Sequence, residues 1–407
     1  MLFFIFSSFA LMASAVVIPG PPGPYLVALR VKAFEDAARW DPHAPQDQPE
    51  KRRVMVSVHV PLKKEAKCSI ETVPYVPPTT AVALGQGAAT LFGLPDTIFS
   101  GMELEFCNID TPCAGAEKNE EYPLVLFSHG RASSRLAHGV LARSLASYGY
   151  IVVTLDHTYD AAIVEFPDGI IRFAENATNS DTAYVKSLLE VSLLFAEPSH
   201  VESKILNIAI PQSRQKDVSF IIDQLLDPSV ATPLLAGTQA SINPEKIFIA
   251  GHSFGGATVA SSLYVDDRIL GGLNFDGQML GPVLAEGIDK PLVLVGTPTT
   301  FDYISGWNET WANLRGPSLM LIVNGTTHMS FFDAPQLPAV KALPIEYSDL
   351  IKQVLGTIDD DVLAKIEIEL LRRTLDFVLE GHRDALCNIE SVGPGVSQLR
   401  VKNFKCS

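Results

Sequence analysis

Short apolar runs separated by helical patterns or loops constrain the fold of this chain more than any other feature. They contain too little alternation of polar and apolar residues to be strands with one face in water. The runs are YPLVLFSHG, IVVTLDH, KIFIAG, RILGGLNFDG, PLVLVGT and SLMLIVNG. Buried strands alternating with helices indicate an α/β fold, in which a mostly parallel sheet is covered by helices on both faces.

The segments around this core complete the predicted organisation. Two N-terminal runs, YLVALRVKAF and KRRVMVSVHVPL, predict an antiparallel opening to the sheet, and a helical stretch of small residues is expected after the Pro-Pro pair in TVPYVPPTTAVALGQGAATLFGLP. Further helices are expected over residues 182–206, in RQKDVSFIIDQLLD and over residues 359–381. Because no repeat and no second linker is apparent, we expect one catalytic domain over residues 16–407, with a C-terminal tail.

The N-terminus predicts export. An apolar run ends in Ala13-Ser14-Ala15, which is typical of a signal-peptide cleavage site. The run is shorter than the roughly 20 apolar residues that a membrane span requires. We therefore expect residues 1–15 to be a cleaved signal peptide and the protein to be secreted.

The net charge and the cysteines indicate which partners, cofactors and disulfides to expect. The net charge is −15 and the pI is near 5.0, so we expect no nucleic-acid partner. No C-x-x-C pair is present, and we expect no metal and no cofactor. In a secreted chain the five cysteines predict disulfides with one left over, and the favoured pairs are Cys107 with Cys113 and Cys387 with Cys406.

Sequons give candidate glycosylation sites at Asn176 and Asn308. A third sequon begins at Asn324, but this residue is close in sequence to a candidate catalytic histidine, so we do not expect a bulky glycan there.

The segment IFIAGHSFGGATVASSLY carries the clearest chemical signal. It places Gly-x-Ser-x-Gly between a buried run and a helical run, the context of a nucleophile elbow. The turn is tight, so small residues are needed at Gly251 and Gly255. Ser253 is therefore the candidate nucleophile, at the N-terminus of a helix whose dipole favours developing negative charge. The alternative is a helix N-cap serine in an ordinary strand–helix turn.

A serine nucleophile needs a base and an acid, which follow it in the chain in this fold. His328 follows the run SLMLIVNG at the carboxyl edge of the sheet and is the expected base. The acid is either Asp276, after LGGLNF, or Asp302, after PLVLVGT, and the pattern alone divides them nearly evenly. For the oxyanion hole we expect the backbone N–H groups of Arg131 and Phe254.

GHSFGGAT, together with LFSHG and the run from PEKIFIAG, resembles the platelet-activating-factor acetylhydrolases of the α/β-hydrolase superfamily. These are secreted, calcium-independent, group VII-type phospholipases A2. The resemblance spans roughly residues 25–332 and implies Ser253, Asp276 and His328 as the triad, with Arg131 and Phe254 at the oxyanion hole. The family commonly has an apolar residue at the position of Arg131. Residues 176–211 and the tail after Gly381 carry no resemblance.

The resemblance implies hydrolysis of the sn-2 acetyl or other short acyl ester of ether phospholipids such as platelet-activating factor. The expected partner is a phospholipid or other ester substrate, with a lipid interface as one setting, and no obligate protein partner. Three alternatives remain: a broader carboxylesterase, lipase or polyester hydrolase; an acyltransferase that uses an alcohol in place of water; and a non-catalytic binding protein on the same fold.

Overall fold

The computed structural model describes residues 15–64, 67–110, 120–174 and 202–406. Most of the predicted signal peptide, Cys113, Asn176 and most of the helix expected over residues 182–206 lie outside these ranges.

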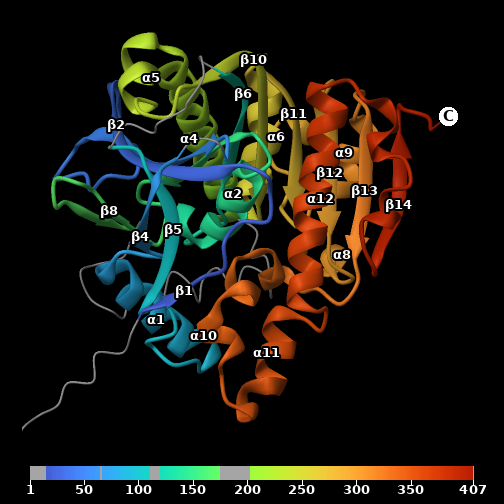
Figure 1. Ribbon diagram of the computed structural model, residues 1–407. Helices are drawn as coiled ribbons and strands as arrows, with labels where there is room; N and C mark the ends of the chain where they lie inside the picture. The colour runs from blue at the N-terminus through green and yellow to red at the C-terminus, as the bar shows by residue number, and fades with distance from the viewer. Residues whose placement is uncertain (1–14, 65–66, 111–119, 175–201, 407) are drawn as a thin grey trace, which may run out of the picture.

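A large mixed sheet organises the described part of the chain (Figure 1). Twelve strands belong to it, and the path through the sheet runs β1-β5-β2-β3-β7-β6-β10-β11-β12-β13-β14, with β4 paired to β5. From β7 to β13 every neighbouring pair is parallel. The strands of this parallel block are β7 (Ile151–His157), β6 (Glu120–Ser128), β10 (Ala240–His252), β11 (Ile269–Phe275), β12 (Leu292–Gly296) and β13 (Ser318–Val323). The predicted α/β fold with a mostly parallel sheet is therefore confirmed.

Antiparallel strands extend the parallel block at both ends. β2 (Leu26–Trp40) pairs with β3 (Lys51–Leu62) in antiparallel fashion, as predicted. β3 also pairs antiparallel with β7, a contact that the sequence did not predict. The residue pattern did not predict β4 (Ser69–Pro74), β5 (Met102–Asn108), β14 (Val396–Lys402) or the separate hairpin of β8 (Ile163–Glu165) and β9 (Ile171–Phe173). A short strand, β1 (Val16–Val17), pairs with β5 immediately after the predicted cleavage site.

Two layers of helices cover the parallel block. Alternate side chains of β6 pack against the two layers. Val125 and Phe127 face α2 (Gly139–Ala146) and α12 (Asp360–Leu379). Leu124 and Leu126 face the side on which α4 (Glu202–Leu226) and α6 (Phe254–Val265) pack. Burial on both faces explains why the strands read as continuous apolar runs. In Figure 1, α12 crosses the near side of the sheet and α6 lies behind it.

Local signals fix the ends of several helices. α1 (Pro78–Phe92) begins with proline at its first position and ends at Gly93, which has a φ of 66°. The Asp359 side chain accepts hydrogen bonds from the Asp361 and Val362 N–H groups at the start of α12. The other helices are α5 (Pro228–Leu234), α7 (Val283–Glu286), α8 (Thr300–Tyr303), α9 (Trp307–Asn313), α10 (Pro338–Lys341) and α11 (Ser348–Leu355), with 3-10 turns at Arg135–His138, His328–Phe331, Ala334–Gln336, Ile345–Tyr347, Arg383–Leu386 and Ile389–Val392.

Two disulfides lie among the described residues, and one of them differs from the predicted pairing. Cys387 and Cys406 are bridged as expected. Cys107 is bridged to Cys68 and not to Cys113. The reason is the β4–β5 pairing that the sequence analysis missed: Ile70 lies opposite Cys107, so the start of β4 brings Cys68 beside the end of β5. No helix among the described residues is long and apolar enough to cross a membrane.

Candidate active site

Ser253 lies at a tight turn between β10 and α6. Its backbone has φ 57° and ψ −123°, a conformation that residues with a side chain rarely adopt. The turn closes only because its neighbours are glycines. A Cβ on Gly255 would lie 2.0 Å from the Ser128 carbonyl oxygen, and one on Gly251 would lie 2.5 Å from the Gly255 carbonyl oxygen. The strain places the Ser253 hydroxyl at the carboxyl edge of the sheet, at the first turn of α6.

Ser253, His328 and Asp276 form one hydrogen-bonded chain. His328 Nε2 lies 2.9 Å from Ser253 Oγ, and His328 Nδ1 lies 2.7 Å from Asp276 Oδ2. A carboxylate can only accept at Nδ1, so Nδ1 carries the proton and Nε2 is free to accept the serine proton. Asp276 is fully buried, and the His328 side chain is 15% exposed. The arrangement can therefore pass the serine proton to the imidazole while the carboxylate orients the ring.

The structure brings Asp276, and not Asp302, to the histidine. Asp276 follows β11 directly, and its own N–H donates to the Val295 carbonyl oxygen at 2.7 Å. Its second carboxylate oxygen accepts from the Thr300 hydroxyl. Asp302 lies one strand further on, exposed on the short helix α8. The end of β11 lies next to the elbow strand β10, which explains why its aspartate reaches the site.

His252 supports the loop that carries His328. Its Nε2 lies 3.0 Å from the His328 carbonyl oxygen, so Nε2 carries the proton and donates. Burial is the largest cause that holds the pKa of His252 well below its ordinary value, and the nearby His328 and His138 rings lower this pKa further. A neutral His252 therefore ties the residue before Ser253 to the backbone of His328.

The loop after β6 lies against Ser253. A Cβ on Gly130 would be 3.1 Å from the Ser253 Cβ, so the residue before Arg131 passes next to the serine. Phe254 follows Ser253 as the first residue of α6. The expected oxyanion residues, Arg131 and Phe254, thus lie on two segments that meet at Ser253.

Three supporting side chains escaped the sequence analysis. Thr300 has a weak signal, because it follows β12 in the stretch that contains Asp302. His252 stands inside GHSFGG, and the sequence indicated no role for it. Arg214, on α4, donates to the His129 and Gly130 carbonyl oxygens beside the site. The sequence gives no signal for this role, since a lone arginine in a helix normally faces solvent. Within the described ranges no group of three or more His, Cys, Asp or Glu residues is placed to hold a metal ion.

A mostly parallel sheet with helices on both faces, and a serine elbow followed in the chain by aspartate and histidine, defines an α/β-hydrolase. The family described as platelet-activating factor acetylhydrolase, isoform II, matches residues 47–342. The match covers more than half of the chain, and the protein belongs to this family.

Two named relatives agree with this assignment, and a solved structure agrees with the fold. The chain is 28% identical over 283 residues to a probable 1-alkyl-2-acetylglycerophosphocholine esterase from Arthroderma benhamiae, a match that covers 68% of this chain and 62% of the relative. It is 29% identical over 252 residues to the platelet-activating factor acetylhydrolase of Bos taurus, covering 57% of this chain and 53% of that protein. A ferulic acid esterase from Streptomyces cinnamoneus superposes with a TM-score of 0.69 at 25% identity, covering 95% of this chain and all of the other.

Proposed function

We propose that this protein is a secreted serine esterase that hydrolyses the sn-2 acetyl or other short acyl ester of ether phospholipids. The hydrogen-bonded chain of Ser253, His328 and Asp276 at the elbow carries the proposal. The substrate class comes from the relatives named platelet-activating factor acetylhydrolase and 1-alkyl-2-acetylglycerophosphocholine esterase.

In the first half-reaction Ser253 Oγ attacks the ester carbonyl carbon as His328 Nε2 takes its proton. Asp276 accepts from Nδ1–H and stabilises the imidazolium. The N–H groups of Arg131 and Phe254 bind the negative oxygen of the tetrahedral intermediate. His328 then gives the proton to the sn-2 oxygen of the departing lysophospholipid, which leaves an acyl-serine.

In the second half-reaction water replaces the alcohol. His328 takes a proton from the water, the hydroxyl attacks the acyl carbonyl, and the carboxylic acid leaves as the proton returns to Ser253 Oγ. The chain's own groups supply every step of this scheme. An acyltransferase would follow the same steps with an alcohol in place of the water.

Secretion is part of the proposal. It rests on the signal-like sequence of residues 1–15 and on the two disulfides, which are typical of oxidising compartments. Asn308 is exposed on α9 and remains a candidate glycosylation site. Asn324 is also exposed, but its amide donates to the Gly395 carbonyl oxygen at 2.9 Å and to Ser397 Oγ at 3.1 Å.

The test is acetate release from an ether phospholipid with an sn-2 acetyl group, with a metal chelator present, by the wild type and Ser253→Ala. We expect chelator-resistant release that falls by about a million-fold in the variant. No release from the phospholipid, with nitrophenyl acetate still cleaved in a serine-dependent way, would contradict the phospholipid proposal.

A second candidate is a broader carboxylesterase. The extensive superposition on a ferulic acid esterase favours it, because that protein covers nearly the whole chain. The ratio of kcat/KM for nitrophenyl acetate to kcat/KM for the acetylated phospholipid separates the two candidates. A ratio well above one favours the broader esterase.

A further inference from the structure

Arg214 of α4 is fully buried, and its guanidinium contacts Ser128, the last residue of β6, and the next two residues, His129 and Gly130. Its Nη1 donates to the His129 carbonyl oxygen at 2.5 Å and to Ser128 Oγ at 3.3 Å. Its Nη2 donates to the Gly130 carbonyl oxygen at 3.2 Å. The planar fork thus grips the backbone just before Arg131, the proposed oxyanion donor.

These contacts have a direct geometric consequence at the site. The Gly130 carbonyl and the Arg131 N–H belong to one planar trans peptide and point in opposite directions. A side chain that holds the carbonyl on one side therefore aims the N–H to the other. A carbonyl that accepts a charged hydrogen bond also polarises its own peptide, which makes the N–H a stronger donor.

Two other groups also contact the Gly130 carbonyl oxygen, but neither replaces the contacts of the Arg214 guanidinium. His129 Nδ1 lies 2.5 Å from the Gly130 carbonyl oxygen, and the Ser133 N–H donates to it at 3.4 Å. Arg214 differs because it binds two consecutive carbonyls from a separate element, so it fixes the path of the loop relative to α4.

Arg214 also reaches the second proposed oxyanion residue. Its guanidinium carbon lies 5.0 Å from the centre of the Phe254 ring, within the range of a cation–π contact. One buried side chain therefore touches the loop before Arg131 and the side chain of Phe254, although the two donors are more than a hundred positions apart in the sequence.

The charge of Arg214 is balanced by Asp160. Nη2 donates to Asp160 Oδ1 at 2.7 Å, and Nε donates to the other oxygen. Burial alone would raise the pKa of Asp160, but the charge and hydrogen bonds of Arg214 hold it below its ordinary value. The Asp160 carbonyl oxygen in turn accepts from the Ala132 N–H at 3.0 Å, so the pair holds the loop on both sides of Arg131.

We propose that Arg214 is a positioning residue for the oxyanion hole, which holds the Arg131 N–H and the Phe254 segment in the orientation that a tetrahedral intermediate requires. This inference rests on the proposed function, because it assigns a role within the esterase site. Arg214 acts through the backbone and does not touch the reacting atoms.

The experiment compares an acetyl ester with its thionoester, whose sulfur accepts hydrogen bonds weakly and gains little from oxyanion donors. The variants are Arg214→Lys, which keeps the charge but loses the fork, and the double variant Arg214→Met with Asp160→Asn, which leaves no buried charge unpaired. Arg52→Lys is the matched control, because Arg52 is equally buried and paired with Asp217 at 2.5 Å. Active sites are titrated first, so that unfolded protein does not enter the rate constants.

We expect both Arg214 variants to lose about 10²-fold in kcat/KM on the acetyl ester, with KM changed by less than about 3-fold. The loss on the thionoester should be at most about tenfold. Arg52→Lys should change both substrates by the same factor. Equal losses on the two esters in the Arg214 variants, or no loss on either, would overturn the inference. Failure of the wild type to cleave the acetyl ester in a Ser253-dependent way would instead refute the proposed function.

Discussion

Thr300 donates a hydrogen bond to one oxygen of the Asp276 carboxylate, while His328 Nδ1 lies 2.7 Å from the other. Both oxygens are thereby engaged, and the carboxylate cannot rotate without breaking a contact. Thr300 Oγ1 itself accepts from the Thr297 N–H at 2.6 Å. The orientation of the proposed catalytic acid is thus set by Thr297 and Thr300, which follow β12 in the same stretch as the rival aspartate, Asp302.

Replacing each candidate aspartate by asparagine tests the assignment of Asp276 as the catalytic acid. Asp276→Asn should lower kcat by about 10⁴-fold, because an amide can donate to Nδ1 and so favour the wrong tautomer of His328. Asp302→Asn is the matched control and should leave kcat near the wild-type value, since Asp302 is exposed on α8. Steady-state kinetics on a nitrophenyl ester measure both. The assignment is wrong if the two variants exchange these results.

Removing the Thr300 hydroxyl tests whether the orientation of the acid matters. Thr300→Val should lower kcat/KM by about tenfold, the equivalent of about 1.4 kcal/mol. It should also reduce the free energy of unfolding by about 2 kcal/mol, because a hydrogen bond to a charged group is lost. Thr300→Ser keeps the hydroxyl and should restore most of both quantities. A serine variant as impaired as the valine variant would mean that the methyl group, and not the hydroxyl, matters.

Buried histidines predict acid sensitivity. Burial lowers the pKa of His138 to about 3, and neither of its ring nitrogens has a hydrogen-bond partner among the described residues. The unfolded chain binds a proton near pH 6.5, whereas the folded protein stays neutral there. The contribution of a neutral, buried His138 to the free energy of unfolding is therefore fully present above pH 6.5. As the pH falls from 6.5 toward 3, the free energy of unfolding decreases by about 1.4 kcal/mol per pH unit because of this residue.

The variant His138→Phe isolates this effect, because it keeps an aromatic ring against Phe127 and Phe332. Urea unfolding at pH 7.5 and pH 4.5 should show the wild type losing about 3 kcal/mol more than the variant on acidification. Contributions from titrating groups that do not interact with His138 cancel in this comparison; His252, whose pKa the His138 ring helps to lower, is the exception. The same loss in both proteins would contradict the prediction.

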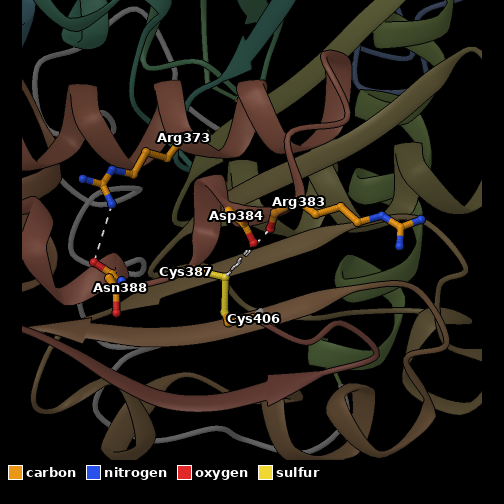
Figure 2. The surroundings of a disulfide bond; sticks show 6 residues. All are labelled: Arg373, Arg383, Asp384, Cys387, Asn388 and Cys406. Atoms are coloured by element: carbon orange, nitrogen blue, oxygen red, sulfur yellow. Dashed lines mark hydrogen bonds between the residues drawn. A yellow bond between two sulfur atoms is a disulfide. The ribbon is translucent and has the colours of Figure 1, made fainter.

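The Cys387–Cys406 disulfide should stabilise the protein without affecting its chemistry. Figure 2 shows the bridge beside Arg383 and Asp384 of the 3-10 turn that follows α12. It closes a segment with a sequence separation of 19, which in the chain-entropy description is worth about 3 kcal/mol. The double variant Cys387→Ser with Cys406→Ser should therefore have a lower Tm and an unchanged kcat at 25 °C. A large loss of kcat would show that β14 and the neighbouring β13 hold the His328 loop in place.

Much of the site could be predicted from the sequence because its signals are local. The elbow needs glycines within two positions of Ser253, and the apolar run before it and the small residues after it identify the strand and helix. His328 follows a buried run directly, and the order of strand ends in a parallel sheet puts it at the same edge as Ser253. The parallel core could be predicted from the sequence for the same reason, because strands that are buried on both faces must be apolar throughout.

What only the tertiary structure decided are contacts between segments far apart in the chain. Asp276 and Asp302 each follow a core strand, and only the position of β11 next to β10 determines which of them reaches His328. Cys107 pairs with Cys68 because two short strands, which lack a strong pattern, lie side by side. Arg214 is one charged residue in a helix, and nothing near it in the sequence indicates that its fork grips the loop before Arg131. Such contacts depend on how the whole sheet and its helices pack, which local residue patterns do not encode.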